Sequence, residues 1–112
     1  MKIKVATDFT TAPGPRMICE GQFSGEEFRK TLVFPKVSEA ISKKCKLTVD
    51  LDGASGYGTS FLEESFGGLI REDGLTLDTI DSVIEFISKD EPALLVEIRE
   101  YLQEAQAERG AN

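Results

Sequence analysis

The sequence predicts an α/β domain of two layers, in which a small mixed sheet of about four strands carries helices mainly on one face. Residues 2–6 and 46–52 alternate polar and apolar side chains, which is the period of a strand with one covered face. The order strand, helix, strand over residues 46–87 predicts a parallel pair joined by a right-handed crossover. The segments between the strands repeat apolar residues at helical spacing.

The size and charge of the chain limit the number of domains, the cellular location and the kinds of partner that we expect. A chain of 112 residues predicts one domain, to which we assign residues 1–107, followed by a frayed tail at 108–112. The beginning of the chain lacks signal-peptide features, and no apolar run is long enough to cross a bilayer, so we expect a cytoplasmic protein. A net charge of −7 argues against nucleic acid or an anionic membrane as the main partner.

The first half of the chain predicts a hairpin and a long helix. Residues 17–20 are apolar enough to form a short second strand that pairs with the first. Ser24 and Glu27 have the spacing of a capping box, which predicts a helix from there to about Lys44. Pro35 removes one hydrogen bond inside this helix, so we expect a kink or two abutting helices at that point.

The second half predicts a strand, a turn and a capped helix. After the strand at 46–52, Ser60 and Glu63 form a second capping box that begins a helix ending near Asp73. Its inward residues are expected to be Leu62, Phe66, Leu69 and Ile70. There follow a connector at 76–81 that can hold one helical turn, a strand at 83–87 and a last helix capped by Ser88 or Asp90. The last helix has a predicted buried stripe of Leu94, Ile98, Tyr101, Leu102 and Ala105.

The turn between the strand at 46–52 and the helix after it is rich in glycine. We expect Gly56 and Gly58 to supply positive φ angles in this turn. The segment 53–60 nearly matches a phosphate-binding P-loop, but Thr59 stands where that motif needs lysine, so we reject nucleotide hydrolysis. Adjacent glycines at 67–68 within a helix predict a close backbone approach, to the sheet or else to a partner.

Thr59 and Ser60 are the leading candidate site residues. Their hydroxyls precede a predicted helix, whose first N–H groups and dipole favour an added anion such as phosphate. The alternative is that Ser60 is only an N-cap. Phe61 is expected to lie about 100° around the helix from the core, partly exposed beside Tyr57 as an aromatic contact surface, or to act as a local covering contact.

Paired acids offer an enzyme-like alternative. Asp50 and Asp52 share one strand face, and Glu63 and Glu64 follow one turn into the helix, so together they could bind Mg²⁺ or transfer protons. The competing interpretation is that these carboxylates cap the turn and the helix start. The chain has no histidine and only two cysteines, without metal-site spacing, so we expect no metal and no cofactor.

Three groups of residues together form a recognisable family pattern. They are Phe9, Gly14, Pro15, Arg16, Ser24, Gly25, Glu26, Glu27, Phe28, Arg29, Asp50, Leu51, Asp52, Gly53, Gly56, Tyr57, Gly58, Thr59, Ser60, Phe61, Leu62, Glu63, Glu64, Phe66, Gly67, Gly68 and Leu69. On these residues, over about 1–107, the chain resembles the STAS-like domain of unknown function family, whose members are similar to the STAS domains of bacterial anti-sigma factor antagonists.

The resemblance implies a regulatory role. In STAS antagonists a partner kinase phosphorylates a serine in this turn, and the helix after it docks on that partner. The phosphorylated position falls on Thr59 here, while Gly58 replaces the aspartate of that motif and Phe61 its glycine. The partner-binding residues implied are Gly56, Tyr57, Gly58, Thr59, Ser60, Phe61 and Glu64.

The sequence therefore predicts a non-enzymatic regulatory module that binds a protein partner through the loop 53–60 and the helix after it. The first partner to consider is a histidine-kinase-like ATPase, and phosphorylation at Thr59 would control the binding. Two alternatives stay open. One is a small metal- or anion-dependent enzyme that uses Asp50, Asp52 and Glu63. The other is a structural homo-oligomer, for example a homodimer joined through the open sheet face or an edge strand.

Overall fold

The computed structural model describes residues 1–110. Its elements, in chain order, are β1 (Lys2–Lys4), α1 (Val5–Asp8), the 3₁₀ helix η1 (Ile18–Glu20), α2 (Gly25–Phe28), the π-helical η2 (Arg29–Val33), α3 (Phe34–Lys43), β2 (Leu47–Asp50), α4 (Thr59–Leu62), the π-helical η3 (Glu63–Gly67), α5 (Gly68–Arg71), α6 (Leu77–Val83), β3 (Ile84–Ile87) and α7 (Ala93–Arg109). None of the helices in residues 1–110 combines the length and apolar character needed to span a bilayer.

The sheet has three parallel strands in the order β1-β2-β3, so the expectation of about four strands in a mixed sheet is wrong. The predicted parallel pair of β2 and β3 is confirmed. The missing strand is residues 17–20, which form η1 instead of pairing with β1. The Met17 N–H donates to the Glu20 carboxylate at 2.9 Å, and the Glu20 N–H donates to the Met17 carbonyl. These local bonds turn the segment back on itself and prevent it from pairing as a strand.

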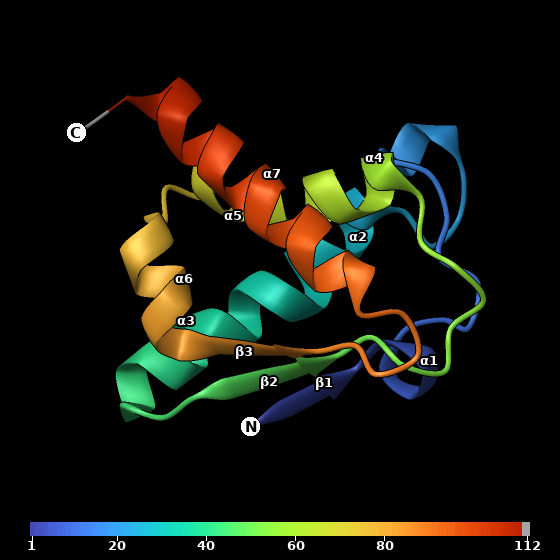
Figure 1. Cartoon of the computed structure of the whole chain (residues 1–112), viewed down its shortest axis with the longest axis horizontal. Helices are drawn as coiled ribbons and strands as arrows, with labels where there is room; N and C mark the ends of the chain where they lie inside the picture. Colours follow the sequence, from blue (N-terminus) through green and yellow to red (C-terminus); the bar gives the residue numbers. More distant parts are fainter. Residues whose placement is uncertain (111–112) are drawn as a thin grey trace.

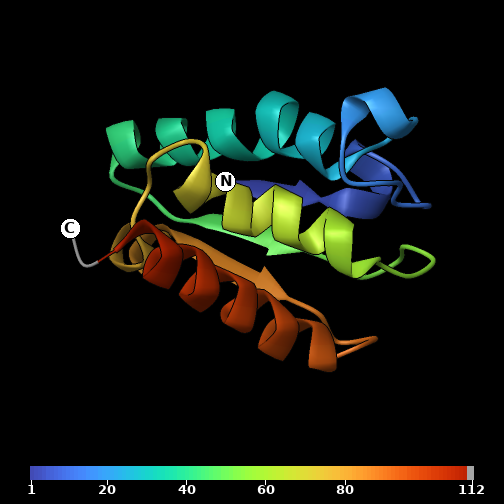
Figure 2. The same ribbon diagram turned by 90° about the horizontal axis from the view of Figure 1, so that it is seen from above.

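Helices cover one face of this sheet and leave the other open. Ile3, Val49 and Phe86 lie in register across the three strands and face the helices, and the first two are fully buried. Lys2, Thr48 and Glu85 lie in register on the opposite face. Figures 1 and 2 show α3, α4 and α7 on the same side of the sheet. The expected two-layer arrangement is therefore observed.

The first long helix is continuous from residue 25 to residue 43. Ser24 is its N-cap, because its Oγ accepts a hydrogen bond from the Glu27 N–H at 3.0 Å. The expected break at Pro35 takes the form of the π-helical segment η2, which ends directly before α3. A wider π turn changes the hydrogen-bond register without ending the helix, so one continuous helix forms and not two abutting ones.

The last elements differ from the predictions mainly at their ends. The expected connector contains a full helix, α6, and Thr76 caps it by accepting from the Thr79 N–H at 3.2 Å. Helix α7 begins after Pro92 without the predicted cap from Ser88 or Asp90. Four residues of its predicted stripe are buried, and Tyr101 is half-buried against them. The helix continues to Arg109, within the predicted tail, and residues 111–112 lie outside the described part.

Several turns lie together at one end of the molecule. The carboxyl ends of the three strands, the first turns of α4 and α7, and the segment that leads into α2 all lie at this end in both views (Figures 1 and 2). In open α/β sheets ligands commonly bind beyond the carboxyl ends of the parallel strands. This end also holds the turn that the sequence singled out.

Candidate functional site

The turn after β2 is held by its own side chains. Asp50 Oδ1 accepts from the Asp52 N–H at 2.9 Å, and the Tyr57 hydroxyl donates to the Leu51 carbonyl at 2.8 Å. Gly53 and Gly56 have φ angles of 91° and 100°, as expected of glycines at turn positions. The expectation for Gly58 is wrong, because its φ is −73°.

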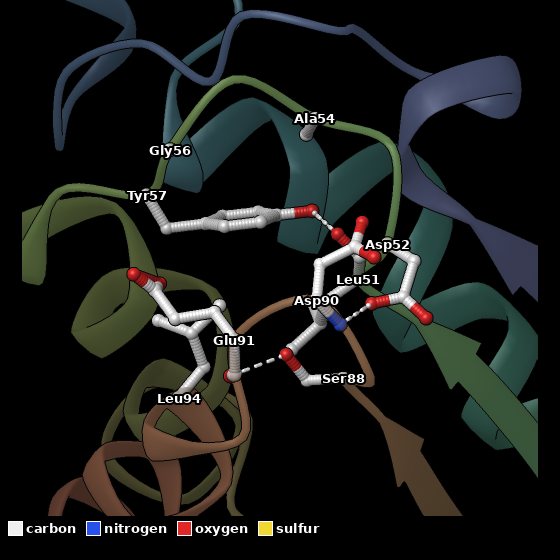
Figure 3. Close-up of a pocket in the computed structure, with 9 residues that line it drawn as sticks. All are labelled: Leu51, Asp52, Ala54, Gly56, Tyr57, Ser88, Asp90, Glu91 and Leu94. Carbon is white, nitrogen blue, oxygen red and sulfur yellow. Dashed lines mark hydrogen bonds between the residues drawn. The ribbon is translucent and has the colours of Figure 1, made fainter.

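A second loop, after β3, closes against this turn. The Asp90 N–H donates to Asp52 Oδ1 at 2.9 Å, and the Gly53 N–H donates to Asp90 Oδ2 at 3.1 Å. A pocket of about 120 Å³ lies between the two loops. Figure 3 shows the Tyr57 ring on one side of it and Ser88, Glu91 and Leu94 on the other. Its lining is Leu51, Asp52, Ala54, Gly56, Tyr57, Ser88, Asp90, Glu91 and Leu94.

The Tyr57 hydroxyl serves as a hydrogen-bond donor at this position. Burial raises the pKa of Tyr57, and the negative charges of Asp50 and Asp52 raise it further. A raised pKa keeps the phenol protonated, and this proton makes the hydrogen bond to the Leu51 carbonyl. Tyr57 therefore has a structural role, because its hydrogen bond holds the turn against the residue that follows β2.

The helix that follows begins at Thr59, with Gly58 as its N-cap and no side-chain cap. The predicted capping box of Ser60 and Glu63 is wrong, because arginines bind the Glu63 carboxylate instead. Thr59 and Ser60 are both exposed. The first N–H groups of a helix have no acceptor within it, so two hydroxyls lie on the surface beside unpaired backbone donors.

Phe61 and Glu64 are not surface residues. Phe61 is 0% exposed, so the expectation that it lies partly exposed is wrong. Its ring packs 5.7 Å from that of Phe28 and 5.9 Å from that of Tyr57. Glu64 is 4% exposed. Of the residues implied to bind a partner, Gly56, Gly58, Thr59 and Ser60 are exposed, and Tyr57 is half-buried.

Arg29 is the centre of a buried charge cluster that the sequence analysis did not identify. Its side chain is 3% exposed, and its guanidinium binds Glu64 Oε2 at 3.0 Å and Asp73 Oδ2 at 2.9 Å. Burial works against the charge, but hydrogen bonds to Asp73 and Glu64 raise the pKa of Arg29 above its ordinary value. The cluster therefore joins η2 to the helix that follows the turn.

Two more arginines close the outer side of this cluster. Arg16 and Arg71 both bind Glu63, and both also reach Glu64, at 3.4 and 3.1 Å. Burial opposes ionisation of Glu63, but the hydrogen bonds from Arg71 and Arg16 hold its pKa below the ordinary value. The negative charges of the two glutamates are thus compensated by arginines from η2, from α5 and from the loop that precedes η1.

The glycine pair inside this helix makes room for the cluster. A Cβ on Gly68 would lie 2.6 Å from Arg29 Nε, and a Cβ on Gly67 would lie 2.5 Å from Glu63 Oε2. The close approach at these glycines is therefore made by side chains, by Arg29 from η2 at Gly68 and by Glu63 of the same helix at Gly67, and not by the sheet or a partner. In η3 the Gly68 N–H bonds to the Glu63 carbonyl, five residues earlier, and Arg29 Nε donates to the Glu64 carbonyl at 3.1 Å.

Replacing Gly68 by alanine tests this geometry. Alanine normally stabilises a helix by up to 1 kcal/mol relative to glycine. Here we expect Gly68→Ala to lower the free energy of unfolding by about 1–3 kcal/mol, because the new methyl group overlaps the Arg29 side chain. Urea denaturation measures the difference, and Gly58→Ala, at a glycine with a φ of −73° and no atom within 4 Å of the new methyl group, controls for the loss of backbone freedom without steric overlap. A stabilised Gly68→Ala variant would contradict the assignment.

The acids proposed for an enzyme are not gathered into one group. Asp50 lies between Lys2 and Lys4, at 3.6 and 3.5 Å, while Glu63 belongs to the arginine cluster. Within residues 1–110, no group of three or more histidine, cysteine or acidic side chains is arranged to hold a metal ion. Cys19 is an exposed free thiol and Cys45 a half-buried one.

Comparisons with known proteins identify the family. No curated protein and no solved structure matches the chain. A family described as a STAS-like domain of unknown function (DUF4325) matches residues 24–93, from the N-cap of α2 to the first residue of α7. The matched segment is well over half of the chain and includes the turn, the helix after it and β3. The chain therefore belongs to the family of STAS-like domains of unknown function.

Proposed function

We propose that this chain is a cytoplasmic, non-enzymatic regulatory module that binds a protein partner through the turn 53–60 and the helix 59–71. Phosphorylation of Thr59 controls that binding in this proposal. The observation that carries it is the exposure of Thr59 and Ser60 at an uncapped helix start, beyond the carboxyl ends of a parallel sheet. Gly56 and Gly58 have open space around them, so a partner surface or a kinase active site can approach the backbone closely.

The surrounding charges support a phosphoryl group at this position. Glu63 and Glu64 follow Thr59 by one helical turn and would repel phosphate if they were unpaired. Arg16, Arg29 and Arg71 compensate both carboxylates, and the Asp90 N–H occupies one oxygen of Asp52. The electrostatic cost of adding phosphate at the helix start is therefore lower than the sequence alone suggests.

A histidine-kinase-like ATPase is the partner that we propose to test first. This choice rests on the family's similarity to STAS domains and is an analogy of fold and site position. A phosphorylated Thr59 would add negative charge to the surface that contacts the partner, so in this proposal phosphorylation weakens the complex.

Intact-mass analysis after incubation with ATP and the kinase-like protein encoded nearest to this chain tests the proposal. We expect the wild-type chain to gain the mass of one phosphoryl group and Thr59→Val to gain none. Ser60→Ala and Ser42→Ala, the latter on an exposed turn of α3, are expected to be modified like the wild type. Size-exclusion chromatography should show a complex with the unmodified chain and its loss after modification.

Two results would overturn the proposal. One is an unmodified wild-type chain together with no complex on the sizing column. The other is modification that persists in Thr59→Val, because the phosphoryl group would then lie elsewhere. Peptide mapping of the modified protein separates Thr59 from Ser60, which is adjacent to it.

A further inference from the structure

Residues 11–23 form a surface strap that lies outside the hydrophobic core. Among these residues, all of which the structure describes, no side chain is buried, whereas Thr10 and Ser24 at its two ends are. The strap lies at the same end of the molecule as α1 and the turn after β2 (Figures 1 and 2). A segment with so little buried apolar surface belongs to the least stable part of a fold.

Backbone bonds attach the strap to the start of α2. The Gly25 N–H donates to the Pro15 carbonyl and the Glu26 N–H to the Arg16 carbonyl, each at 2.9 Å. At its beginning the strap is tied to the turn 53–60, because Ser55 donates to the Thr11 carbonyl from both its N–H and its hydroxyl. These bonds leave Arg16 as the charged side chain that ties the strap to the helix 59–71.

The arginines of the cluster differ in how easily they can leave it. The Arg29 side chain is 3% exposed, and its departure would leave the buried carboxylate of Glu64 without its closest partner. The Arg16 side chain is 36% exposed, and Arg71 continues to bind Glu63 when Arg16 leaves. The contact of Arg16 is therefore exchangeable and screened by salt, while that of Arg29 is fixed.

The strap covers aromatic side chains beside the turn. Phe23, with a φ of 55°, places its ring 5.5 Å from that of Phe9 in an edge contact. The Phe9 ring in turn packs 5.0 Å from Phe28 and 6.4 Å from Phe61. If the strap lifts, Phe9 and the seam between α2 and α4 lose their cover. An apolar surface would then open directly beside the exposed hydroxyls of Thr59 and Ser60.

We propose that residues 11–23 are a lid on this aromatic seam, that Arg16 is its latch on Glu63 and Glu64, and that the lid opens while the helix 59–71 stays in place. Opening of the lid exposes apolar area and so enlarges the partner-binding surface. The role of the lid in regulation therefore rests on the proposed function. Its opening is a property of the chain alone and can be measured without any partner.

Amide hydrogen exchange of Arg16→Gln tests the latch. We expect exchange at Gly25 and Glu26, which donate to strap carbonyls, to rise about three- to fivefold, the amount that corresponds to loss of an exposed ion pair. Amides within the helix 59–71 should keep their wild-type rates. Raising the salt concentration should speed exchange at Gly25 and Glu26 in the wild type and have little further effect in the variant.

Arg99→Gln is the matched control, because Arg99 binds Asp81 at 2.7 Å in an exposed pair on other elements. The proposal is overturned if Arg16→Gln exchanges at Gly25 and Glu26 like Arg99→Gln. It is also overturned if exchange along the helix 59–71 rises as much as in the strap. Should Arg16→Gln fail to fold, Arg16→Lys retains the charge without the guanidinium fork and must show a smaller rise of the same pattern. A failed phosphorylation assay would leave these exchange results unaffected.

Discussion

Replacing Arg29 by glutamine is expected to lower the free energy of unfolding by about 3–5 kcal/mol, since removing one member of a buried ion pair leaves an uncompensated buried charge. The substitution removes the partner of Glu64 and Asp73 and the donor to the Glu64 carbonyl. Arg29 connects the helix 25–43 to the helix 59–71 through their π-helical segments η2 and η3, so the packing between these two helices should loosen. Urea or guanidinium denaturation, followed by circular dichroism, measures the change.

Lys43→Gln is the matched control for the loss of a positive charge. Lys43 binds Glu39 at 2.7 Å one turn earlier on α3, with both side chains exposed. Such an exposed pair contributes little to stability, because solvent screens the two charges. An Arg29→Gln variant that loses no more stability than Lys43→Gln would show that the cluster is not the link between the helices. Arg29→Lys should fall between the two, because lysine keeps the charge but cannot reach both carboxylates as a fork.

Replacing Phe61 by alanine is expected to cost about 3–5 kcal/mol of unfolding free energy, as for other fully buried phenylalanines. The ring contacts Phe28 and Tyr57, and its loss opens a cavity under the start of the helix 59–71. Tyr57 also pins the turn to Leu51, so the turn should become more mobile. Denaturation measures the stability, and hydrogen exchange measures the turn.

Phe23→Ala provides the contrast for Phe61. Phe23 is 40% exposed on the strap. Phe23→Ala is expected to lower the free energy of unfolding far less, on the order of 1 kcal/mol, because only part of the Phe23 ring is removed from water. A surface aromatic at position 61 would give the opposite ranking, with stability kept and partner binding lost. Phe61→Ala with wild-type stability would therefore contradict its assignment to the core.

The periodic features of this fold could be predicted from the sequence. Alternation located β2, and the apolar run 83–87 located β3; together they indicated a parallel pair. The helical stripe over Leu94, Ile98 and Leu102 identified the buried face of α7. In these elements apolar residues repeat every two residues along a strand and about every 3.6 residues along a helix. The repeat is visible in a single sequence because each element packs one face against the core.

The position of Phe61 could not be read from that period. Its expected exposure assumed a regular helix, in which it would lie about 100° from Leu62. The helix is π-helical from Glu63 to Gly67 and is buried on nearly all sides, with Glu64 to Ile70 all inaccessible. Because nearly every face of this helix is buried, an angle of 100° from Leu62 does not expose Phe61, whereas the apolar period of a sequence identifies one buried face.

The charge cluster was missed because its members are distant along the chain. Arg29 lies 35 residues from Glu64 and 44 from Asp73. Charged residues are usually solvated, so a sequence analysis assigns Arg29 and Glu64 to the surface unless a pairing is visible. The signal that could have found it was the glycine pair, Gly67 and Gly68, since glycines inside a helix indicate that something large crosses there.

The exposed thiol of Cys19 gives the strap a reporter of its own. Cys19 lies in η1, within the lid, while Cys45 is half-buried just before β2 at the opposite end of the sheet. A thiol-reactive fluorophore therefore reaches Cys19 first, without any engineered cysteine. Lid movement in the native chain becomes visible as a change in emission, in real time and at low protein concentration.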